Sequence, residues 1–447
     1  MDSKLEYHRL VDTLYTINQE RKIQFGLENT RALIQHHAIC CPSRFKTIHV
    51  AGTNGKGSVT TKLARAVQAG GYRVGLFTSP HLISFRERIQ VDGKMISEEE
   101  IVLLLTEIIR VAEHHKIYLT FFEFTTVLAF AYFNSKGCEF AVVEVGMGGR
   151  LDSTNVITPE VAVITSIGLD HCHVLGHTVE EICLEKCGIV KRRVPLVIGP
   201  SVPESVVREV VETVGTRYHR VETTDGDYDV ENSGVAKQAY IELLQLGKFP
   251  RLLPDHDPLI TQSLAARPPC RFQTVIVSDS LKVVLDVAHN PPAFARLLEQ
   301  VESKFGGHRL HLIIGLASDK DAASILRLVV PVVDHLYIVQ SDLARAYCVK
   351  DLREALAGVE RELGVGPNTK LVIAAEGDGN VRSTLGEVVV KTKTKTKDEP
   401  QLIVVAGTFG IMADALSFLE VPEFSALQPD PKKLSEAFHA STDPTKY

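Results

Sequence analysis

The sequence predicts an α/β protein with two domains, of which the first is a doubly wound, mostly parallel sheet with a phosphate-binding loop. Three observations predict this fold. The chain has 447 residues, more than one core normally holds. From Lys46 onward, short β-branched runs alternate with amphipathic stretches. A proline-rich stretch near 250–269 separates two such series, so we expect domains at 1–268 and 269–447.

The first domain begins its alternation with a strand at residues 47–50. A glycine-rich turn follows, and then a helix with Val59, Leu63, Ala66 and Val67 at helical spacing. Further strands are expected at 73–77, 140–145, 161–165 and 195–198, and helices around 101–114 and 124–133. Residues 140–145 are nearly all apolar, which is typical of a parallel strand buried on both faces. Such sheets bind ligands at the carboxyl ends of their strands.

The second domain is expected to be a smaller α/β domain in which the same alternation resumes. Its predicted strands are 283–286, 312–315, 336–339, 371–374 and 402–405. The cationic tract Lys391–Lys397, which alternates lysine with threonine, is predicted to be a solvated loop.

Composition and charge exclude several classes of protein. The chain is 45% apolar and 23% charged with a net charge of −6, so it is neither disordered nor a general nucleic-acid binder. Eight scattered cysteines form no C-x-x-C pair and are interpreted as reduced thiols. No apolar run approaches the roughly 18 residues of a membrane helix. We therefore expect a cytoplasmic protein without nucleic-acid or membrane partners.

The strongest local signal is the run Ala-Gly-Thr-Asn-Gly-Lys-Gly-Ser at 51–58, which leaves a strand and opens a helix. Glycines allow backbone N–H groups to approach an anion, the helix N-terminus adds its dipole, and Lys56 supplies a point charge. The run departs from the general phosphate-loop pattern at two positions. Val50 stands where the first glycine is expected, and Gly57 separates the lysine from the hydroxyl of Ser58.

Other polar residues follow strands at the same expected edge of the sheet. Glu144 ends a buried strand before the glycine-rich residues 146–149, while Ser79 and His171 follow two neighbouring strands. These three could form a magnesium shell, although imidazole is an unusual ligand for Mg²⁺, and by chemistry alone His171 is an orienting base. Lys186, on a downstream helix, is either part of this site or an ordinary solvated lysine.

The whole set of motifs resembles one family, the ATP-dependent Mur-type amide ligases, in their folylpolyglutamate synthase and dihydrofolate synthase branch, with the bacterial bifunctional pattern. The motifs that carry the resemblance are 52–58, 78–82, 120–123, 144–155, 170–171, 185–189, Asn232, 269–272, 286–291 and 319–321. The resemblance implies a Mur-ligase-like domain followed by a Rossmann-like domain that closes on ATP and binds glutamate.

The resemblance also implies roles for individual residues. ATP phosphates and nucleotide would contact Asn54, Gly55, Lys56, Gly57, Ser58, Asn232, Arg271 and Asp286. Magnesium would be held by Ser79, Glu144 and His171, with two ions expected and K⁺ as a further candidate. Lys186 matches the lysine that the family carbamylates, and His289 matches a residue near the incoming amino acid, so that Lys56, Lys186 and His289 are the expected catalytic residues.

The substrate expected from the resemblance is a dihydropteroate. The positions that would bind it are Ile23, Phe25, Thr120, Phe122, Glu123, Leu151, Asp152 and Ser153. An aspartate beside aromatic walls suits a pterin, whose ring stacks while its N–H edge donates to a carboxylate.

The implied reaction uses ATP to convert a carboxylate into an acyl phosphate, from which the amine of L-glutamate displaces phosphate. We expect dihydropteroate and reduced folates as acceptors, in a monomer. A monofunctional folylpolyglutamate synthase and a nucleotide-dependent binding switch are the alternatives. Three positions depart from the family pattern, namely Cys270 and Val287, where glycine is usual, and Thr408, where serine is usual.

Overall fold

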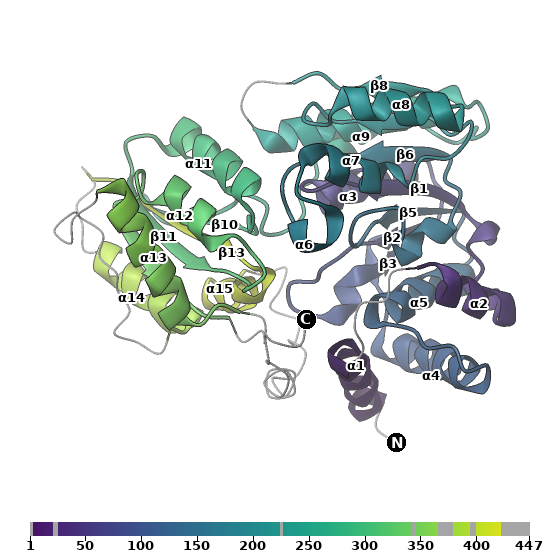
Figure 1. The fold of residues 1–447 in the computed structure, drawn as a ribbon, viewed down its shortest axis with the longest axis horizontal. Helices are drawn as coiled ribbons and strands as arrows, with labels where there is room; N and C mark the ends of the chain where they lie inside the picture. Colours follow the sequence, from purple (N-terminus) through teal and green to yellow (C-terminus); the bar gives the residue numbers. More distant parts are fainter. Residues whose placement is uncertain are drawn as a thin grey trace. The chain divides into compact units, whose positions relative to one another are not determined.

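The computed structural model describes residues 3–20, 26–223, 227–341, 346–364, 379–393 and 399–421 (Figure 1). Contacts divide the chain into two compact units, Met1–His81 with Phe85–Pro268, and Leu82–Ser84 with Pro269–Tyr447. The first unit contains an eight-stranded sheet and the second a five-stranded sheet. The predicted α/β fold with two mostly parallel sheets is therefore confirmed.

The sheet of the first unit has the order β4-β3-β2-β5-β1-β6-β7-β8. Its strands are β1 (Lys46–Ala51), β2 (Val74–Phe77), β3 (Ile89–Val91), β4 (Lys94–Met95), β5 (Phe140–Glu144), β6 (Val161–Ile164), β7 (Leu196–Ile198) and β8 (Tyr218–Arg220). The six strands from β2 to β8 in this order are parallel, so their carboxyl ends meet at one edge. The predicted strands are confirmed, whereas the short strands β3, β4 and β8 were not expected from the sequence.

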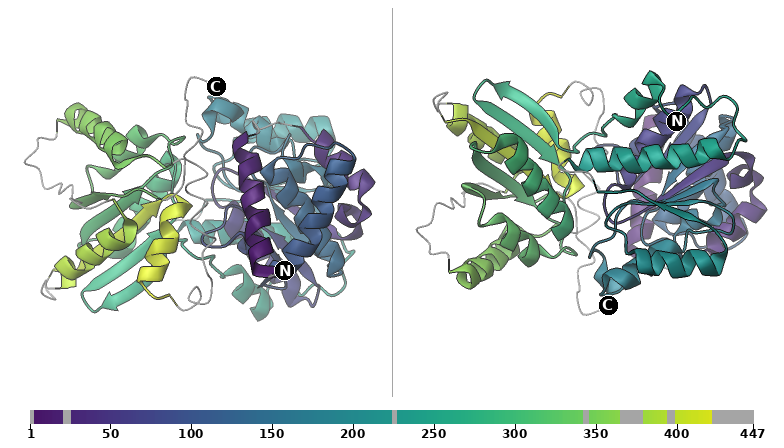
Figure 2. Two further views of the ribbon diagram at one scale, coloured as in Figure 1. Left: turned by 90° about the horizontal axis from the view of Figure 1, so that it is seen from below. Right: turned by 90° about the horizontal axis from the view of Figure 1, so that it is seen from above.

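Helices cover both faces of this sheet (Figure 2). They are α1 (Ser3–Glu20), α2 (Glu28–His36), α3 (Lys56–Ala69), α4 (Glu98–His114), α5 (Phe121–Ser135), α6 (Cys172–Leu175), α7 (Val179–Cys187), α8 (Glu204–Val214), α9 (Tyr228–Gln245) and α10 (Pro258–Leu264). The helices α3, α9 and α10 share one core cluster with the sheet. The other clusters join the sheet to α1, α4 and α5, and to α7 and α8.

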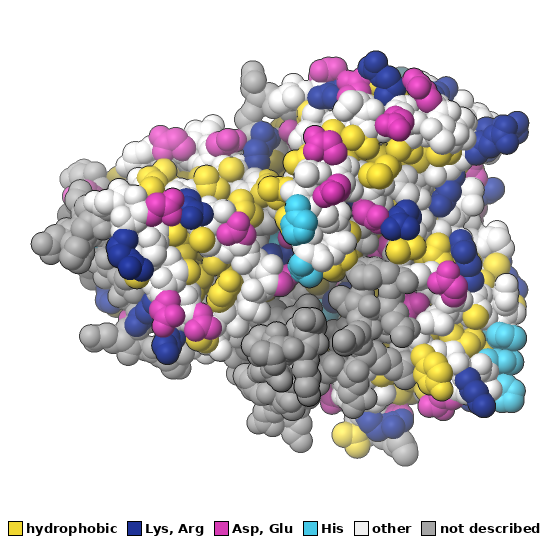
Figure 3. Space-filling view, in the orientation of Figure 1, with side chains coloured by type: hydrophobic (Ala, Val, Ile, Leu, Met, Phe, Trp, Pro, Cys, Tyr) yellow, Lys and Arg dark blue, Asp and Glu magenta, His cyan; other side chains and the backbone are white. Residues whose placement is uncertain are grey.

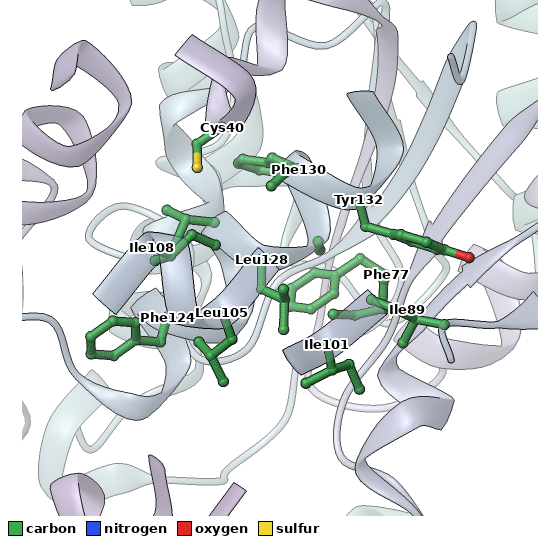
Figure 4. Packing of buried hydrophobic residues seen from close by; sticks show 14 of the residues in the cluster. Cys40, Phe77, Ile89, Ile101, Leu105, Ile108, Phe124, Leu128, Phe130 and Tyr132 are labelled. Carbon is green, nitrogen blue, oxygen red and sulfur yellow. The ribbon is translucent and has the colours of Figure 1, made fainter. Parts of the chain in front are cut away.

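The core beside α4 and α5 shows why these segments are helical. The predicted helix around 101–114 places its buried apolar residues at three- and four-residue spacing, whereas the helix around 124–133 is apolar and buried on nearly all sides. Their side chains converge in Figure 4, where Leu105 and Ile108 of α4 lie near Leu128 of α5 and Phe77 of β2. Capping boxes at Ser97 and Thr120 begin the two helices.

The described strands of the second unit form a smaller sheet with the order β12-β11-β13-β10-β9, in which the edge strand β9 is antiparallel to β10. Its strands are β9 (Gln273–Ser278), β10 (Leu281–Asp286), β11 (Arg309–Gly315), β12 (His335–Ile338) and β13 (Gln401–Gly407). Its helices are α11 (Pro291–Phe305), α12 (Ala322–Val329), α13 (Val349–Leu363), α14 (Val381–Lys393) and α15 (Met412–Phe418). The strand predicted at 371–374 lies outside the described residues.

The prediction of a solvated loop at 391–397 is wrong for its first three residues, which form the end of α14. Thr392 is 2% exposed, and its hydroxyl donates to the carbonyl of Val388 at 2.7 Å. Thr392 continues the buried stripe of α14, which includes Leu385 and Val388 at helical spacing. The low-complexity pattern concealed this continuation, and residues 394–397 lie outside the described chain.

The surface carries mixed charge. Acidic and basic side chains are interspersed over the face drawn in Figure 3. Within the described ranges, every helix is either too short or too polar to cross a lipid bilayer.

Candidate active site

The phosphate loop runs from the end of β1 into α3, as predicted. Gly55 is the N-cap of α3 with φ +84°, and Gly52 has φ +153°, so both adopt backbone conformations that favour glycine. A Cβ on Gly52 would lie 1.9 Å from Oγ1 of Thr165. The ammonium of Lys56 folds back on the loop and donates to the carbonyls of Gly52 at 3.0 Å and Thr53 at 3.1 Å.

The loop is held by the segment that follows β6. The hydroxyls of Thr165 and Ser166 donate to the carbonyl of Asn54 at 2.6 and 2.9 Å. The hydroxyl of Thr53 donates to the carbonyl of Gly168 at 3.1 Å. These bonds fix the loop before any ligand binds, and Thr165 and Ser166 were not singled out from the sequence. Two hydroxyl residues directly after a buried strand were the available signal.

Glu144 and Ser79 are brought together as predicted. Glu144 ends β5 and is 3% exposed, and its Oε2 accepts a hydrogen bond from the backbone N–H of Ser79 at 2.9 Å. Because β5 lies between β2 and β1, the carboxylate is placed between the segment after β2 and the phosphate loop. A buried carboxylate beside a phosphate loop supplies the hard oxygen donors that Mg²⁺ prefers.

His171 lies at the N-cap of α6 with φ +51°, a conformation that is uncommon for a residue with a side chain. Its backbone N–H donates to Asp170 Oδ1 at 2.9 Å, and its Nε2 lies 3.9 Å from Asp170 Oδ2. The loop that carries both residues follows β6, and Gly168 of this loop is bonded to Thr53. The segment that carries His171 is thereby bonded to the phosphate loop through Gly168.

Lys186 is buried, at 4% exposure, near the end of α7. Burial, followed by the charge of Lys56, lowers the pKa of its amine to about 7, while Asp170 and Asp152 act in the opposite direction. Interpretation as an ordinary solvated lysine is therefore wrong. The charges of Lys56, Asp170 and Asp152 therefore all act on the Lys186 amine.

Glycines allow the loop at 146–150 to lie directly against α7. A Cβ on Gly149 would lie 2.8 Å from the carbonyl oxygen of Lys186, and one on Gly188 would lie 2.3 Å from Cα of Arg150. Asp152, 7% exposed, closes this loop by accepting from the N–H groups of Gly146 and Met147 at 3.1 and 3.0 Å. The loop is thus held between Glu144 and Lys186.

A buried histidine supports Asp152 from the centre of the sheet. Nε2 of His49 lies 2.9 Å from Oγ1 of Thr154, and the same hydroxyl donates to Oδ1 of Asp152. Since the hydroxyl proton goes to the carboxylate, the proton between His49 and Thr154 belongs to Nε2 of His49, as it does in the neutral tautomer protonated at that nitrogen. Burial lowers the pKa of His49 to about 3, in agreement with this state.

The predicted pteroate positions in the described chain lie beside this loop. Thr120 and Glu123 form the capping box of α5, and Glu123 also accepts from Thr30 at 3.3 Å. The Phe122 ring approaches Gly146, where a Cβ would lie 2.4 Å from its Cζ. Ser153 lies 2.7 Å from the hydroxyl of Thr126. Leu151 is half-buried, and Ile23 and Phe25 lie outside the described residues.

The first unit also contains a fully buried lysine that sequence reasoning missed. Lys62 on α3 is 0% exposed and lies 3.1 Å from Oδ1 of Asp229. Its position three residues after Val59 and four before Ala66 places it on the buried stripe of the predicted helix, which was the available signal.

Asn232, on the same helix as Asp229, lies against the phosphate loop, because a Cβ on Gly55 would be 2.2 Å from its Oδ1.

The second unit holds Arg271, Asp286 and His289 near one another at the end of β10. Asp286, 4% exposed, accepts from the backbone N–H of Phe272 at 2.7 Å through Oδ2 and from that of Ala288 at 2.8 Å through Oδ1. His289 donates from Nδ1 to a backbone carbonyl at 2.8 Å, which leaves Nε2 as the acceptor nitrogen when the ring is neutral.

Arg271 lies between two residues in the left-handed region. Cys270 has φ +53° and Phe272 has φ +50°. This twisted backbone brings the guanidinium carbon of Arg271 to 5.6 Å from the ring centre of Phe409. The left-handed conformation at Cys270 is the physical reason that glycine suits this position.

Comparison with known proteins agrees with this geometry. The Mur ligase middle domain matches residues 50–212, and the Mur ligase glutamate ligase domain matches residues 270–410. Folylpolyglutamate synthase of Lacticaseibacillus casei is 34% identical over 352 residues, covering 70% of this chain and 81% of the relative. The chain belongs to the folylpolyglutamate synthase and dihydrofolate synthase family of ATP-dependent Mur ligases. The bifunctional dihydrofolate synthase/folylpolyglutamate synthase of Escherichia coli is 33% identical over 356 residues, covering 75% and 82% of the two chains.

Solved structures of this family have the same fold. E. coli FolC in complex with DHPP and ADP aligns with a TM-score of 0.78 at 29% identity, covering 93% of this chain and 98% of FolC. Mycobacterium tuberculosis folylpolyglutamate synthase complexed with ADP and AMPPCP aligns with a TM-score of 0.79 at 27% identity, covering 94% and 99%. A bifunctional enzyme with Mn, AMPPNP and L-glutamate bound aligns with a TM-score of 0.74 at 28% identity, covering 90% and 95%.

Proposed function

We propose that this chain adds L-glutamate to dihydropteroate, as a dihydrofolate synthase, and to the tail of reduced folates, as a folylpolyglutamate synthase. The observation that carries the proposal is the placement of a phosphate loop, the buried Glu144 and the buried Lys186 at one edge of one sheet. The names of the relatives and the ligands of the solved structures support these substrates.

The chain's own residues account for the chemistry of this reaction. Backbone N–H groups at 54–58 and the ammonium of Lys56 bind the ATP phosphates, and Asn232, Arg271 and Asp286 contact the nucleotide. The acceptor carboxylate attacks the γ-phosphorus, which forms an acyl phosphate and releases ADP. The amine of glutamate then attacks the acyl carbon, an amide forms, and phosphate leaves as the amine loses a proton. Lys56 and Arg271 stabilise the negative charge in both steps.

The side chains after β2, β5 and β6 fit magnesium. Glu144 supplies a buried carboxylate, Ser79 a hydroxyl and His171 an imidazole. Among the described residues, no three His, Cys, Asp or Glu side chains form a metal cage of their own. Mg²⁺ is usually bound by one or two carboxylates together with substrate phosphates and water, and a donor set with one carboxylate beside a phosphate loop has that character. When bound, the ion neutralises phosphoryl oxygens.

Lys186 is proposed to be carbamylated. Its amine, with a pKa of about 7, is largely neutral at slightly alkaline pH, and only a neutral amine attacks carbon dioxide. The ammonium first loses one proton, and formation of the N–C bond from the neutral amine gives a carbamate and releases a second proton, so that a buried cation becomes an anion. Such an anion would help to hold a second magnesium ion, and K⁺ is a further proposed ligand.

The proposed pteroate site lies between α5 and the loop at 146–153. Phe122 offers an aromatic face beside Gly146, and Asp152 offers a carboxylate, although each of its oxygens already accepts two hydrogen bonds from the chain. A carboxylate accepts about four hydrogen bonds, and Asp152 already accepts that number. A pterin N–H would therefore have to share an acceptor oxygen with a donor of the chain. The proposed pteroate site also includes the neighbouring residues Thr120, Glu123, Leu151 and Ser153, together with Ile23 and Phe25.

A substrate panel tests the function. Full-length protein with ATP, Mg²⁺ and glutamate is expected to release phosphate with dihydropteroate and with a reduced monoglutamyl folate, and mass spectrometry should detect dihydrofolate and the diglutamate. Turnover of the folate alone would establish the monofunctional alternative. Turnover with neither acceptor would contradict the ligase proposal.

A nucleotide-dependent binding switch makes a different prediction for the second unit. A switch has no use for Arg271, Asp286 and His289, so its nucleotide response would survive Arg271→Ala, whereas ligase turnover would not.

A monomeric state and a cytoplasmic location are also proposed, and the eight free cysteines support the location.

A further inference from the structure

The buried ammonium of Lys62 joins three parts of the first unit. It donates to the carbonyls of Leu264 and Ala266, each at 2.8 Å, and to Oδ1 of Asp229 at 3.1 Å. An ammonium group has three donors, and these three acceptors satisfy all of them. The carbonyl of Leu264 closes α10, so Lys62 also provides a partner for a helix end that would otherwise be buried without one.

Arg267 extends this arrangement along the chain. Its Nε lies 2.9 Å from Oδ2 of Asp229, and its outer nitrogen lies 2.6 Å from Oδ2 of Asp227. We call Lys62, Asp227, Asp229 and Arg267 the linker anchor. The proline-rich segment is therefore fixed to α3 and α9 as far as Arg267, and the long segment of the second unit begins two residues later, at Pro269.

The linker anchor is continuous with the nucleotide site. Lys62 lies on the helix that the phosphate loop opens, six residues after Lys56. On α9, Ser233 donates to the carbonyl of Leu264 at 2.9 Å, and its neighbour Asn232 lies against Gly55 of the phosphate loop. Thus adjacent residues of one helix contact the phosphate loop and the linker.

We propose that Lys62 is a positioning residue for the ligase reaction, because it fixes the chain at 264–267 from which Arg271 follows four residues later. This inference rests on the proposed function, in which Arg271 stabilises charge on the transferring phosphoryl group. A free linker would let Arg271 sample more positions, whereas the phosphate loop would still bind nucleotide. Loss of the anchor would therefore lower turnover more than nucleotide affinity.

Three variants of the full chain test the proposal. Lys62→Met removes the ammonium. The double variant Lys62→Met/Asp229→Asn also neutralises the carboxylate that has lost its lysine partner, which should recover part of the thermal stability although it weakens the ion pair with Arg267. Lys248→Met is the matched control, because it breaks an exposed ion pair with Glu160. In both Lys62 variants, kcat should fall about 10- to 100-fold, while KM for ATP changes by less than about threefold.

Hydrogen exchange supplies a readout that is independent of turnover. The amides of Ala265 and Ala266, which are bonded to α10 carbonyls, should exchange at least about tenfold faster in both Lys62 variants and at the wild-type rate in Lys248→Met. Recovery of kcat together with thermal stability in the double variant would overturn the proposal and leave Lys62 a structural role. Unchanged exchange in Lys62→Met would also overturn it. If the wild-type chain has no ligase activity, exchange still decides whether Lys62 holds the linker, so the two failures are distinguishable.

Discussion

The backbone N–H of Ser79 donates to Oε2 of Glu144 at 2.9 Å, so the segment after β2 is fixed by the carboxylate that ends β5. One oxygen of Glu144 thereby orients the chain that carries the Ser79 hydroxyl. This hydrogen bond therefore holds two expected metal ligands, Ser79 and Glu144, in place before magnesium binds.

Glu144→Gln should keep an acceptor for Ser79 N–H and remove the negative charge. We expect turnover to fall by about 10²- to 10³-fold with little change in melting temperature, because the charge and not the hydrogen bond serves the metal. Phosphate release at several Mg²⁺ concentrations, with Mn²⁺ binding followed by electron paramagnetic resonance, would measure this. Wild-type Mn²⁺ affinity in the variant would contradict the assignment of Glu144 as a ligand.

Lys186→Ala should lose most activity, by about 10²-fold or more, because the proposed carbamate cannot form. Addition of a small carboxylate such as acetate or formate should restore part of the turnover by supplying the missing anion. Lys191→Ala, which removes a lysine bonded to Asn155 at 2.7 Å, tests whether such rescue is specific to position 186. Equal activity of Lys186→Ala and wild type would show that Lys186 has no catalytic role.

Gly188→Ala should destabilise the protein and reduce turnover. The new Cβ would lie 2.3 Å from Cα of Arg150, so the loop at 146–150 must move away from α7, at a cost of about 1–3 kcal/mol in unfolding free energy. Gly358→Ala on α13 is the matched control, since no atom lies within 4 Å of its Cβ, and it should stabilise by about 0.5–1 kcal/mol. Urea unfolding of both variants measures the difference, and equal effects would refute the steric argument.

Cys270→Gly should be more stable than Cys270→Ala by about 1 kcal/mol. Both variants remove the buried thiol, but only glycine relieves the left-handed backbone at φ +53°. Thermal and urea unfolding of the pair measure this difference directly. An alanine variant that equals or exceeds the glycine variant would show that this backbone carries no strain.

His49→Gln should reduce the acid sensitivity of folding. The pKa of His49 is lowered from 6.5 to about 3, so between these values the unfolded chain binds a proton that the folded chain does not. The unfolding free energy therefore decreases as pH falls through this interval, by up to about 1.4 kcal/mol per pH unit, and the contribution vanishes above pH 7. Urea unfolding at pH 5 and pH 7 should show a smaller decrease for His49→Gln. An identical decrease would mean that His49 is charged in the folded protein.

The sequence allowed prediction of the long parallel strands, because a strand such as Phe140–Glu144 is apolar on both faces. It failed for β4, which has only two residues, since so short a segment has no detectable periodicity. It also failed at Thr392, where a repeated Lys-Thr pattern concealed the end of a helix. In both cases the structure depends on packing against segments distant in sequence, and the local sequence pattern holds no information about that packing.

In the candidate site, too, some residues could be predicted from the sequence and others could not. The phosphate loop, Glu144 and His171 could be singled out because the loop follows a predicted strand, Glu144 ends another, and His171 lies in the segment after a third. The buried state of Lys186 and Lys62 could not, because burial of a lysine depends on the carbonyls and carboxylates that distant segments bring to it. The linking of His49 to Asp152 through Thr154 likewise joins residues more than 100 positions apart.

The sheet order β2-β5-β1-β6 places four consecutive parallel strands side by side. Neighbouring strands are about 4.8 Å apart, so the lateral spacing of the segments after them is inherited from the backbone ladder. Side-chain substitutions elsewhere in the core therefore leave the spacing between the ligand-bearing loops unchanged. Homologues can diverge widely in their packing and still present the same distances to a triphosphate.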